Sequence, residues 1–312
     1  MKNRDNKPNW AGHGSRLWQQ RIGWLVVLLG LAGLAVLIVS GVVGWQLTHP
    51  PRVAVDQTPA ALGLSYEPVS FFSRDDGVEL EGWLLPAATN RRTVILAHGY
   101  RRNRLHSDIQ LLDLARVLVA NGNNVLMFDF RNCGESGGGL TSVGQFEVND
   151  LLGAVDFIRD RPELSRKVVV QGFSMGAATA ILAGSREPAV AAVVADSAFA
   201  DLKPYLESNL SLWTGLPAVP FNRAFLLVTP LLTGLQPDQV SPVAEIPGLN
   251  GRKVLLIHGE ADIDIPPSNS EQLQAACPGA ELLRFPGAGH VRSLLIDRER
   301  YHRELLRFLN TV

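Results

Sequence analysis

Residues 168–184 read VVVQGFSMGAATAILAG, an apolar run that leads into a glycine-flanked serine and then into an alanine-rich stretch. The first part has the length and the β-branched residues of a buried strand, and the last part is typical of a helix. Between them, Gly172-Phe173-Ser174-Met175-Gly176 has the form G-x-S-x-G. At a strand-to-helix junction this form indicates a sharp turn from which the serine Oγ projects at the edge of the sheet. We therefore predict a strand–turn–helix unit with Ser174 as a nucleophile.

Short apolar runs alternate with longer amphipathic stretches on both sides of this unit. The expected strands are 78–85, 93–98, 124–131, 167–171, 190–196, 253–258 and 281–285, and the expected helices are 106–121, 145–161, 175–185 and 297–309. Such alternation predicts an α/β fold with an open, mostly parallel sheet and helices on both faces. Residues 65–74 and 78–85, separated by Asp75-Asp76-Gly77, predict an antiparallel hairpin at its start.

Residues 202–250 fit the alternation poorly. This stretch holds Trp213 and Phe225 among many leucines and is repeatedly broken by proline. It is too interrupted for one helix and too apolar for an ordinary loop, so we expect short helices that form a small apolar cap over one end of the sheet. A second membrane span is the competing interpretation, which Asn222 and Arg223 in the middle of the stretch oppose.

The N-terminal region contains a long uncharged stretch, residues 22–47. At about 1.5 Å per residue it exceeds the roughly 30 Å hydrocarbon core of a bilayer, and Trp24 and Trp45 lie near its ends, where indoles favour the interface. These features predict a transmembrane signal-anchor helix. A cleaved signal peptide, with Ser40 or Gly44 at the cleavage site, is the alternative, but its apolar region would be only about 7–15 residues long.

Charges around this stretch predict its orientation. The residues before it include one acid, Asp5, and several basic side chains: Lys2, Arg4, Lys7, Arg16 and Arg21. Beyond it, Arg52 and Asp56 cancel. The positive-inside rule therefore predicts a cytoplasmic tail over residues 1–21 and a catalytic domain, residues 65–312, on the extracytoplasmic side of the cell membrane. Residues 48–64, which contain three prolines, are expected to form the linker.

Composition narrows the class of protein. The chain has 312 residues, 46% hydrophobic and 19% charged, with a formal net charge of −1. This length allows one large α/β domain and the charge balance argues against nucleic acid as a partner. Cys133 and Cys277 are too few for a disulfide framework and are expected to be independent free thiols. The sequence carries no signal for an oligomeric state.

A nucleophilic serine requires a base to remove its proton and a carboxylate to orient that base. The histidines downstream of Ser174 are His258, His290 and His302. His290 ends the glycine-rich segment PGAGH after the last expected strand, where a loop can return an imidazole to the nucleophile, so we expect it to be the base. His302 lies among charged residues of the last helix and is expected to be solvated, and His258 is expected to be a packed structural residue.

The carboxylate is expected after the strand 253–258. Three acids follow that strand, Glu260, Asp262 and Asp264. The turn beyond the strand favours Asp262, but spacing alone does not separate it from Asp264. Asp196, at the end of an earlier strand, is a further alternative.

An acyl-transfer site also needs donors for a developing oxyanion. Met175 N–H, at the start of a helix, is one expected donor. Tyr100 N–H, in His98-Gly99-Tyr100 after the strand 93–98, is the other. We expect no metal and no organic cofactor, because His258 and Asp262 are only two of the ligands that a zinc site would need.

Together these segments carry a family resemblance. They are Ile95–Tyr100, Asp129–Ser136, Gly172–Gly176, His258–Asp262 and Gly289-His290. Their order and spacing resemble the α/β-hydrolase superfamily, especially the single-span serine hydrolases that bacteria and eukaryotes share. The resemblance extends from about residue 62 to the C-terminus.

The resemblance implies an eight-stranded, mostly parallel sheet. It also implies a triad and an oxyanion hole formed by Ser174, Asp262, His290, Tyr100 and Met175, which favours Asp262 over Asp264 as the acid. One departure is Asn132, where relatives often carry glycine. Asparagine tolerates left-handed backbone angles better than most residues, so we expect the loop to be preserved.

The expected activity is two-step acyl transfer from a carboxylic ester, thioester or amide through an acyl-enzyme on Ser174. The apolar cap and the membrane anchor suggest a small-molecule acyl or lipid-like substrate, with Trp213 and Phe225 influencing its binding. An acyltransferase on the same triad is one alternative. A non-catalytic binding protein of the same fold is the other.

Overall fold

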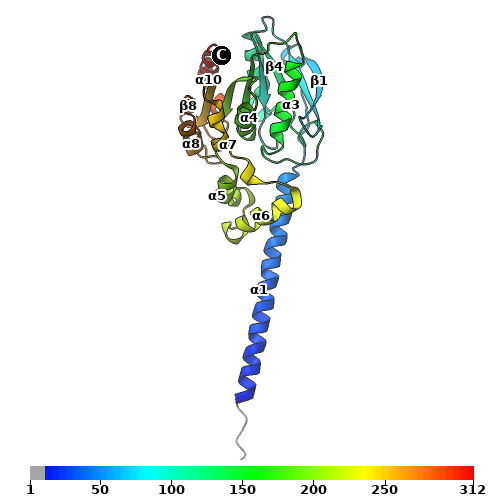
Figure 1. The fold of residues 1–312 in the computed structure, drawn as a ribbon, viewed down its shortest axis with the longest axis vertical. Helices are drawn as coiled ribbons and strands as arrows, with labels where there is room; N and C mark the ends of the chain where they lie inside the picture. The colour runs from blue at the N-terminus through cyan, green and yellow to red at the C-terminus, as the bar shows by residue number, and fades with distance from the viewer. Residues whose placement is uncertain (1–10) are drawn as a thin grey trace, which may run out of the picture.

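A long N-terminal helix leads into an α/β domain (Figure 1). The computed structural model describes residues 11–312. Helix α1 (Ala11–Thr48) begins before the apolar stretch, and its part from Trp18 to Thr48 is long and apolar enough to cross a membrane. The basic residues Lys2, Arg4 and Lys7 of the expected tail lie outside the described residues.

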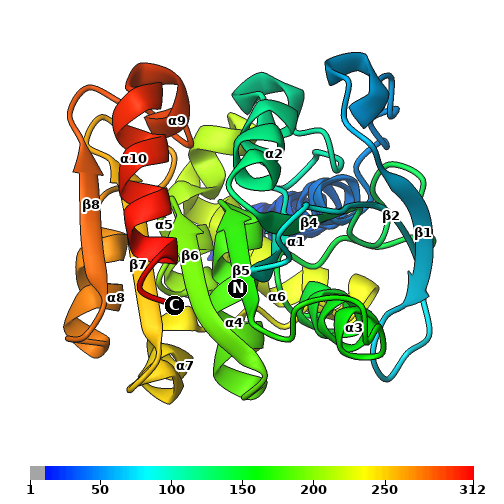
Figure 2. The same cartoon turned by 90° about the horizontal axis from the view of Figure 1, so that it is seen from above.

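Eight strands form one sheet in the order β1-β2-β4-β3-β5-β6-β7-β8, which crosses Figure 2 from β1 on one side to β8 on the other. They are β1 (Glu67–Phe72), β2 (Glu79–Leu85), β3 (Arg92–Ala97), β4 (Asn123–Phe128), β5 (Val168–Phe173), β6 (Val190–Asp196), β7 (Lys253–Gly259) and β8 (Glu281–Phe285). Strand β2 pairs antiparallel with β1 and β4, and the other pairs are parallel. The predicted fold class and the opening hairpin are confirmed.

Helices cover both faces of the sheet. One face packs against α2 (Leu111–Ala120) and α10 (Arg298–Leu309), and the other against α3 (Glu147–Arg159), α4 (Met175–Arg186) and α8 (Ser268–Ala276). Within β3, Val94 and Leu96 point to the first core and Ile95 and Ala97 to the second. Both faces are buried, which is why the strands are continuous apolar runs in the sequence. Shorter elements are η1 (Pro59–Leu62), η2 (Ser107–Ile109), η3 (Pro237–Gln239), α7 (Pro242–Glu245), η4 (Ile246–Leu249) and α9 (Ser293–Ile296).

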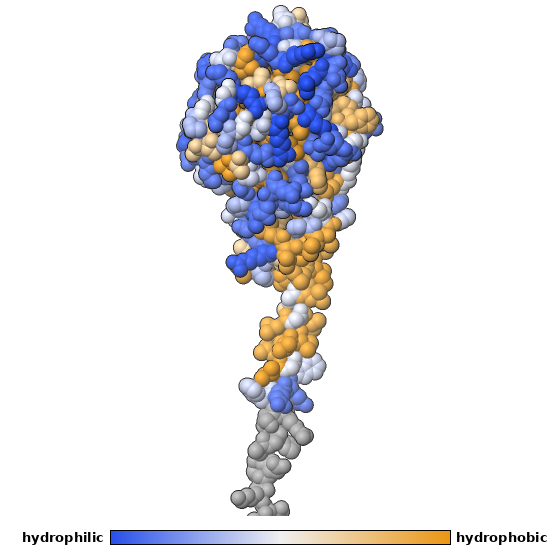
Figure 3. All heavy atoms as spheres, viewed as in Figure 1, coloured by the Kyte–Doolittle hydropathy of each residue, from blue (hydrophilic) through white to orange (hydrophobic). Residues whose placement is uncertain are grey.

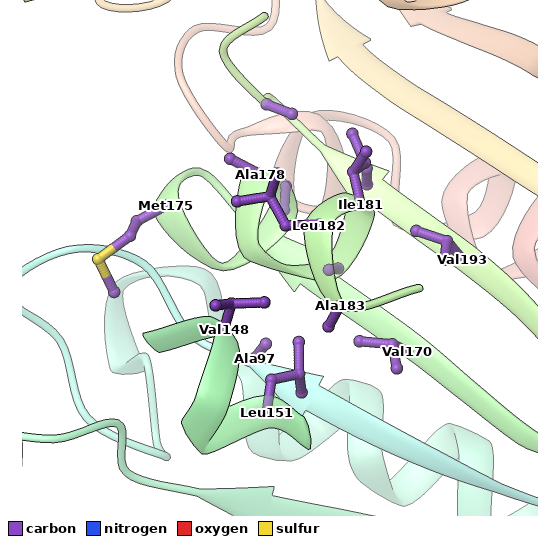
Figure 4. Packing of buried hydrophobic residues seen from close by; sticks show 14 of the residues in the cluster. Ala97, Val148, Leu151, Val170, Met175, Ala178, Ile181, Leu182, Ala183 and Val193 are labelled. Carbon is purple, nitrogen blue, oxygen red and sulfur yellow. The ribbon is translucent and has the colours of Figure 1, made fainter. Parts of the chain in front are cut away.

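The alanine-rich helix α4 packs closely on the sheet (Figure 4). Ala178 and Ile181 come from this helix, Val193 from β6, and Val148 from the neighbouring helix α3; all four are fully or almost fully buried. Small side chains on α4 let its backbone approach the strands, while the larger residues on α3 fill the space beside it. The helix that begins at the G-x-S-x-G turn is therefore held firmly.

The predicted cap consists of short helices and lies at the end of the domain where α1 joins it (Figure 1). Its main elements are α5 (Leu202–Thr214) and α6 (Ala218–Thr233), which meet at an angle of 118°. Helix α6 packs along α1, where a Cβ added at Gly41 would lie 3.1 Å from Leu232 Cδ1, and one added at Gly44 would collide with Thr229. Glycines on α1 therefore allow the two helices to approach closely.

The linker lies along the domain. Thr141 N–H donates a hydrogen bond to Thr48 O, and Asn103 Nδ2 donates to Ala54 O, both 2.8 Å long. Arg52 donates to Ser136 O and Gly138 O. These contacts could not be predicted from the sequence, because they join the linker to loops far away in the chain.

One expected helix differs from the structure. Residues 106–121 form η2 and then α2, because His106 and Gln110 adopt positive φ angles of 39° and 57°. Such left-handed residues interrupt helical hydrogen bonding. Helix α2 retains the predicted apolar face, with Leu111, Leu114 and Leu118 fully buried.

Candidate active site

The G-x-S-x-G turn forces the backbone of Ser174 into an unusual conformation, with φ 54° and ψ −116°. A Cβ at Gly172 would collide with the carbonyl group of Gly176, and a Cβ at Gly176 would collide with the carbonyl oxygens of Ala97 and His98. Only glycine fits these two positions, because the start of α4 crosses directly over the ends of β3 and β5. The strained turn presents Ser174 at the end of β5, as predicted.

A continuous line of hydrogen bonds joins three of the predicted residues. His290 Nε2 lies 2.8 Å from Ser174 Oγ, and His290 Nδ1 lies 2.8 Å from Asp262 Oδ2. An ionised carboxylate only accepts hydrogen bonds, so Nδ1–H donates to Asp262 and Nε2 accepts from the serine hydroxyl. The loops after β5, β7 and β8 thus bring Ser174, Asp262 and His290 together.

Asp262 is held as a buried anion. Its Oδ1 accepts hydrogen bonds from the backbone N–H groups of Asp264, 3.0 Å, and Ile265, 2.9 Å. Burial alone raises the pKa of Asp262, but its contacts with His258 and His290 outweigh that effect and lower the pKa to about 2. The carboxylate of Asp264 is exposed and His290 bonds to Asp262, so the geometry separates the two acids that spacing alone could not.

The two predicted oxyanion donors flank the serine. Met175 begins α4, and the loop after β3 lies against Ser174, since a Cβ at Gly99 would be 3.6 Å from Ser174 Cβ. Within residues 11–312, neither the Met175 N–H nor the Tyr100 N–H donates a hydrogen bond to the protein. Both amides are therefore available to a ligand at Ser174.

The other downstream histidines differ in their surroundings. His258 is buried, with Nδ1 2.5 Å from Ser270 Oγ and Nε2 2.8 Å from Ile265 O, as a packed structural residue would be. The expectation that His302 is a solvated surface group is wrong. Its side chain is half-buried, its Nε2 is enclosed without a hydrogen-bond partner among the described residues, and burial lowers its pKa. The amphipathic pattern of α10 places it beside α2, which charge alone did not reveal.

A cavity of about 620 Å³ opens over Ser174 and His290. Its apolar wall includes side chains from the sheet edge and the cap: Tyr100, Val143, Phe199, Tyr205 and Trp213. Residues from the anchor and linker complete it, namely Leu47, Pro51, Arg52 and Val53. Phe225, which we expected to influence substrate binding, lies outside this cavity and is buried beside α1 and α5.

Comparison with known proteins assigns the family. The sequence model of a family described as serine aminopeptidase, S33, matches residues 88–241. YqkD of Bacillus subtilis is 30% identical over 239 residues, which are 76% of this chain and 77% of that protein. The chain belongs to the α/β-hydrolase superfamily.

Two further relatives of this α/β-hydrolase carry named activities. The solved structure of esterase Pf2001 from Pyrococcus furiosus superposes on this structure with a TM-score of 0.70 and 29% sequence identity. The match covers 85% of this chain and 98% of the esterase chain. The thiohydrolase aneE of Aspergillus aculeatus is 32% identical over 120 residues, 38% of this chain and 36% of that protein.

Tyr100 links three parts of this α/β-hydrolase. Its hydroxyl donates a 2.5 Å hydrogen bond to Leu47 O near the end of α1. Its ring stacks on Trp213 of the cap, with centroids 6.5 Å apart and planes inclined by 9°. Burial raises the pKa of Tyr100 to about 12, so the hydroxyl stays protonated and able to donate at neutral pH. The sequence singled out Tyr100 for its backbone amide and gave no signal for these side-chain contacts.

A second, charged recess of about 340 Å³ adjoins the serine and His290 on another side. Arg102, Asp108 and Arg292 line it, and Asp108 pairs with Arg102 at 3.0 Å and with Arg292 at 3.3 Å. The α/β-hydrolase therefore offers a larger cavity with an apolar wall and a smaller, charged recess; Ser174, His290 and Arg102 line both.

Three side chains at the site could offer ligand atoms to a metal ion. These atoms of Asp262, Asp264 and His290 lie within 4.8 Å of one another. Two of them already share the 2.8 Å hydrogen bond between Asp262 and His290, so a metal would have to displace that bond. The absence of a cofactor stays a prediction.

Asp196, the further candidate for the acid, lies at the end of β6 and does not contact His290 through its carboxylate. Its backbone carbonyl accepts from Ser174 N–H at 2.8 Å, and its buried carboxylate accepts from Ser197 Oγ and Tyr301 Oη, both at 3.0 Å. Ser197 Oγ in turn accepts from Val291 N–H, next to His290. His290 Nδ1 bonds to Asp262 and not to this carboxylate, so Asp196 can support the site only through its neighbours. Burial raises the pKa of Asp196 to about 6, above its ordinary 3.8.

Replacing Asp196 should change how stability depends on pH. Because the pKa of Asp196 is higher in the folded than in the unfolded state, the folded state holds the proton more tightly. This contribution to the free energy of unfolding is fully present below about pH 4 and is lost as the pH rises through about 6. For a shift of about two pKa units the loss is about 3 kcal/mol. Asp196→Asn keeps a donor and an acceptor but carries no charge. We expect it to match the wild type at pH 4 and to be more stable by up to about 3 kcal/mol at pH 8.

Thermal unfolding of the detergent-solubilised chain from pH 4 to pH 8 measures this effect. The control is Glu260→Gln, which removes an exposed carboxylate near the same sheet edge. Parallel stability curves for the wild type and Asp196→Asn would contradict the prediction.

Proposed function

We propose that this α/β-hydrolase is a serine hydrolase that cleaves a carboxylic ester, thioester or amide through an acyl-enzyme on Ser174. The observation that carries the proposal is the unbroken hydrogen-bonded line from Ser174 Oγ through His290 to Asp262, with both bonds 2.8 Å long. A triad is recognised by such geometry and by the roles of its members.

The proposed reaction has two steps. His290 Nε2 takes the Ser174 proton while Oγ attacks the substrate carbonyl carbon, and the oxyanion accepts hydrogen bonds from Tyr100 N–H and Met175 N–H. The bond to the leaving group then breaks, and His290 returns the proton to that group. Water, activated by His290, releases the acid and restores the serine. Asp262, with its low pKa, stays ionised throughout and stabilises the imidazolium.

An amphiphilic acyl compound fits this site best. The apolar wall of the larger cavity would hold the acyl chain, and the charged recess with Asp108 and Arg292 would hold a polar leaving group. The esterase and thiohydrolase names of two relatives support an ester or thioester as the reacting bond.

Labelling with a fluorophosphonate probe tests the triad. Ser174→Ala should abolish labelling, because the probe reacts with the serine oxygen. His290→Ala and Asp262→Asn should slow it by about 1,000-fold or more, since base and orienting acid are lost. The matched control is Asp264→Asn, which keeps the backbone N–H that binds Asp262 and should label within about threefold of the wild-type rate.

A folded wild type that never labels would overturn the hydrolase proposal in favour of a non-catalytic binding protein. Once labelling is established, product analysis with added alcohols or amines distinguishes hydrolysis from acyl transfer. A hydrolase should yield mainly free acid, whereas dominant transfer to the acceptor would identify an acyltransferase on the same triad.

Chain-length preference tests the assignment of the apolar cavity. Trp213→Ala removes part of its wall, so kcat/KM for p-nitrophenyl decanoate should fall about tenfold, because each buried methylene contributes about 0.8 kcal/mol. The acetate ester should change less than about twofold. Leu212→Ala, an exposed neighbour that does not line the cavity, is the control. Equal losses for both esters would refute the assignment.

We further propose that residues 22–47 of α1 remain as a signal anchor in the cell membrane, with residues 65–312 as the extracytoplasmic catalytic domain. Leu37 and Ile38 of α1 line a groove together with Leu232 of α6, so cleavage at Ser40 or Gly44 would remove part of the packing between the two helices. The excess of basic residues before the span supports the orientation.

Protease treatment of spheroplasts that express a doubly tagged chain tests this topology. The C-terminal tag should be digested without lysis, while the N-terminal tag stays protected, and the untreated chain should migrate at its full mass. Loss of the N-terminal tag before treatment would identify a cleaved signal peptide. A C-terminal tag that is protected until lysis would reverse the orientation.

A further inference from the structure

The outer face of cap helix α6 is strongly apolar and exposed. Leu231 is 81% exposed and Val219 79%, and Leu227 and Leu232 are also exposed. Monomeric soluble proteins rarely leave such residues grouped in contact with water. In Figure 3 the apolar surface of α1 continues onto the base of the domain, where α6 lies.

The apolar face of α6 is continuous with the proposed membrane anchor. An apolar groove of about 470 Å³ separates the outer surfaces of the two helices, with Ile38, Val42 and Trp45 on the α1 side and Val228 and Leu232 on the α6 side. Lipid that surrounds this part of α1 would therefore also cover the exposed leucines of α6.

The point at which α6 contacts α1 determines how deep α6 would lie in the bilayer. The 20 residues from Ile22 to Gly41 span about 30 Å, the thickness of a hydrocarbon core. Helix α6 meets α1 at Gly41 and Gly44, at one end of that span. This level corresponds to the boundary between acyl chains and headgroups, where amphipathic helices lie in the plane of the membrane.

The rest of the cap does not favour a second crossing. Tyr205, Leu206 and Leu210 of α5 are buried within the domain, and the 118° bend carries α6 away from the direction of α5. Arg223 is the one charged residue of α6, and it lines a recess with Lys203 and Glu207 that Leu227 borders, whereas Leu232 lines the groove beside α1. Helix α6 thus has a lipid-compatible face and a polar side, the pattern of an interfacial helix.

We propose that α6 lies in the membrane interface beside α1, with Val219, Leu231 and Leu232 covered by the acyl chains of the leaflet next to the catalytic domain. This inference rests on the proposed membrane anchor. Leu47 follows the contact region by one turn and lines the catalytic cavity, so the cavity stands at the level of the lipid headgroups. A substrate chain can then pass from the leaflet to Ser174 without entering bulk water.

Site-specific fluorescence quenching tests the position of α6. The full-length chain is reconstituted in phosphatidylcholine nanodiscs, and single cysteines carry an NBD label. Native Cys133 and Cys277 are 2% and 1% exposed and so react poorly. Labels at Leu231→Cys and Leu232→Cys should be quenched by doxyl-labelled acyl chains about threefold more than the control label at Asp238→Cys, an exposed position in η3. A label at Leu29→Cys, in the middle of the span, is the positive control.

Equal quenching at Leu231→Cys and Asp238→Cys, with Leu29→Cys strongly quenched, would overturn the inference. Weak quenching at Leu29→Cys would overturn both the anchor and this inference. Fluorophosphonate labelling of the same samples reports separately on the hydrolase proposal. Normal labelling with unquenched α6 would refute the interfacial position alone, and quenched α6 without labelling would uphold that position while refuting the hydrolase.

Discussion

The close approach of main chain to main chain beneath Ser174 is the constraint on which the rest of the site depends. Gly172 and Gly176 allow the first turn of α4 to cross the ends of β3 and β5 with no side chain between them. That crossing holds the serine in its strained conformation and sets the Met175 amide beside it. It also brings the loop after β3, which contains Tyr100, against Ser174. A single Cβ at either glycine would separate these groups.

Buried polar groups then hold the neighbouring loops in place. Asp262 is fixed by two backbone amides before it meets His290, so the imidazole approaches a carboxylate that is already oriented. On the opposite side, Asp129 accepts hydrogen bonds from the backbone and guanidinium of buried Arg104 and from Glu135 N–H. These interactions tie the loop after β3 to the loop after β4. The loops around the site are therefore held by buried, charge-assisted hydrogen bonds.

The sequence predicted what depends on local pattern. The strands, the serine turn and the loop of His290 follow from apolar runs and glycine positions, and Asn132 adopts the left-handed conformation, φ 57°, that its side chain tolerates. In the sequence, only the family resemblance favoured Asp262 over Asp264 as the acid. Spacing could not do so, because it does not show which carboxylate faces the imidazole of His290. The contribution of Leu47 and Arg52 to the cavity could not be predicted, because it depends on where a proline-containing segment lies in space. The partial burial of His302 likewise depends on packing between distant helices.

The bound linker has a consequence for the working range of the molecule. A flexible tether would let a domain swing and sample a volume whose radius grows with the square root of tether length. Here the residues after α1 are hydrogen-bonded to the domain, and α1 itself packs on α6. The domain and its helix therefore move as one body with almost no reach. In the proposed membrane-anchored state, this rigid attachment would keep the opening of the cavity at one height above the bilayer, and the molecule would reach new substrate by lateral diffusion.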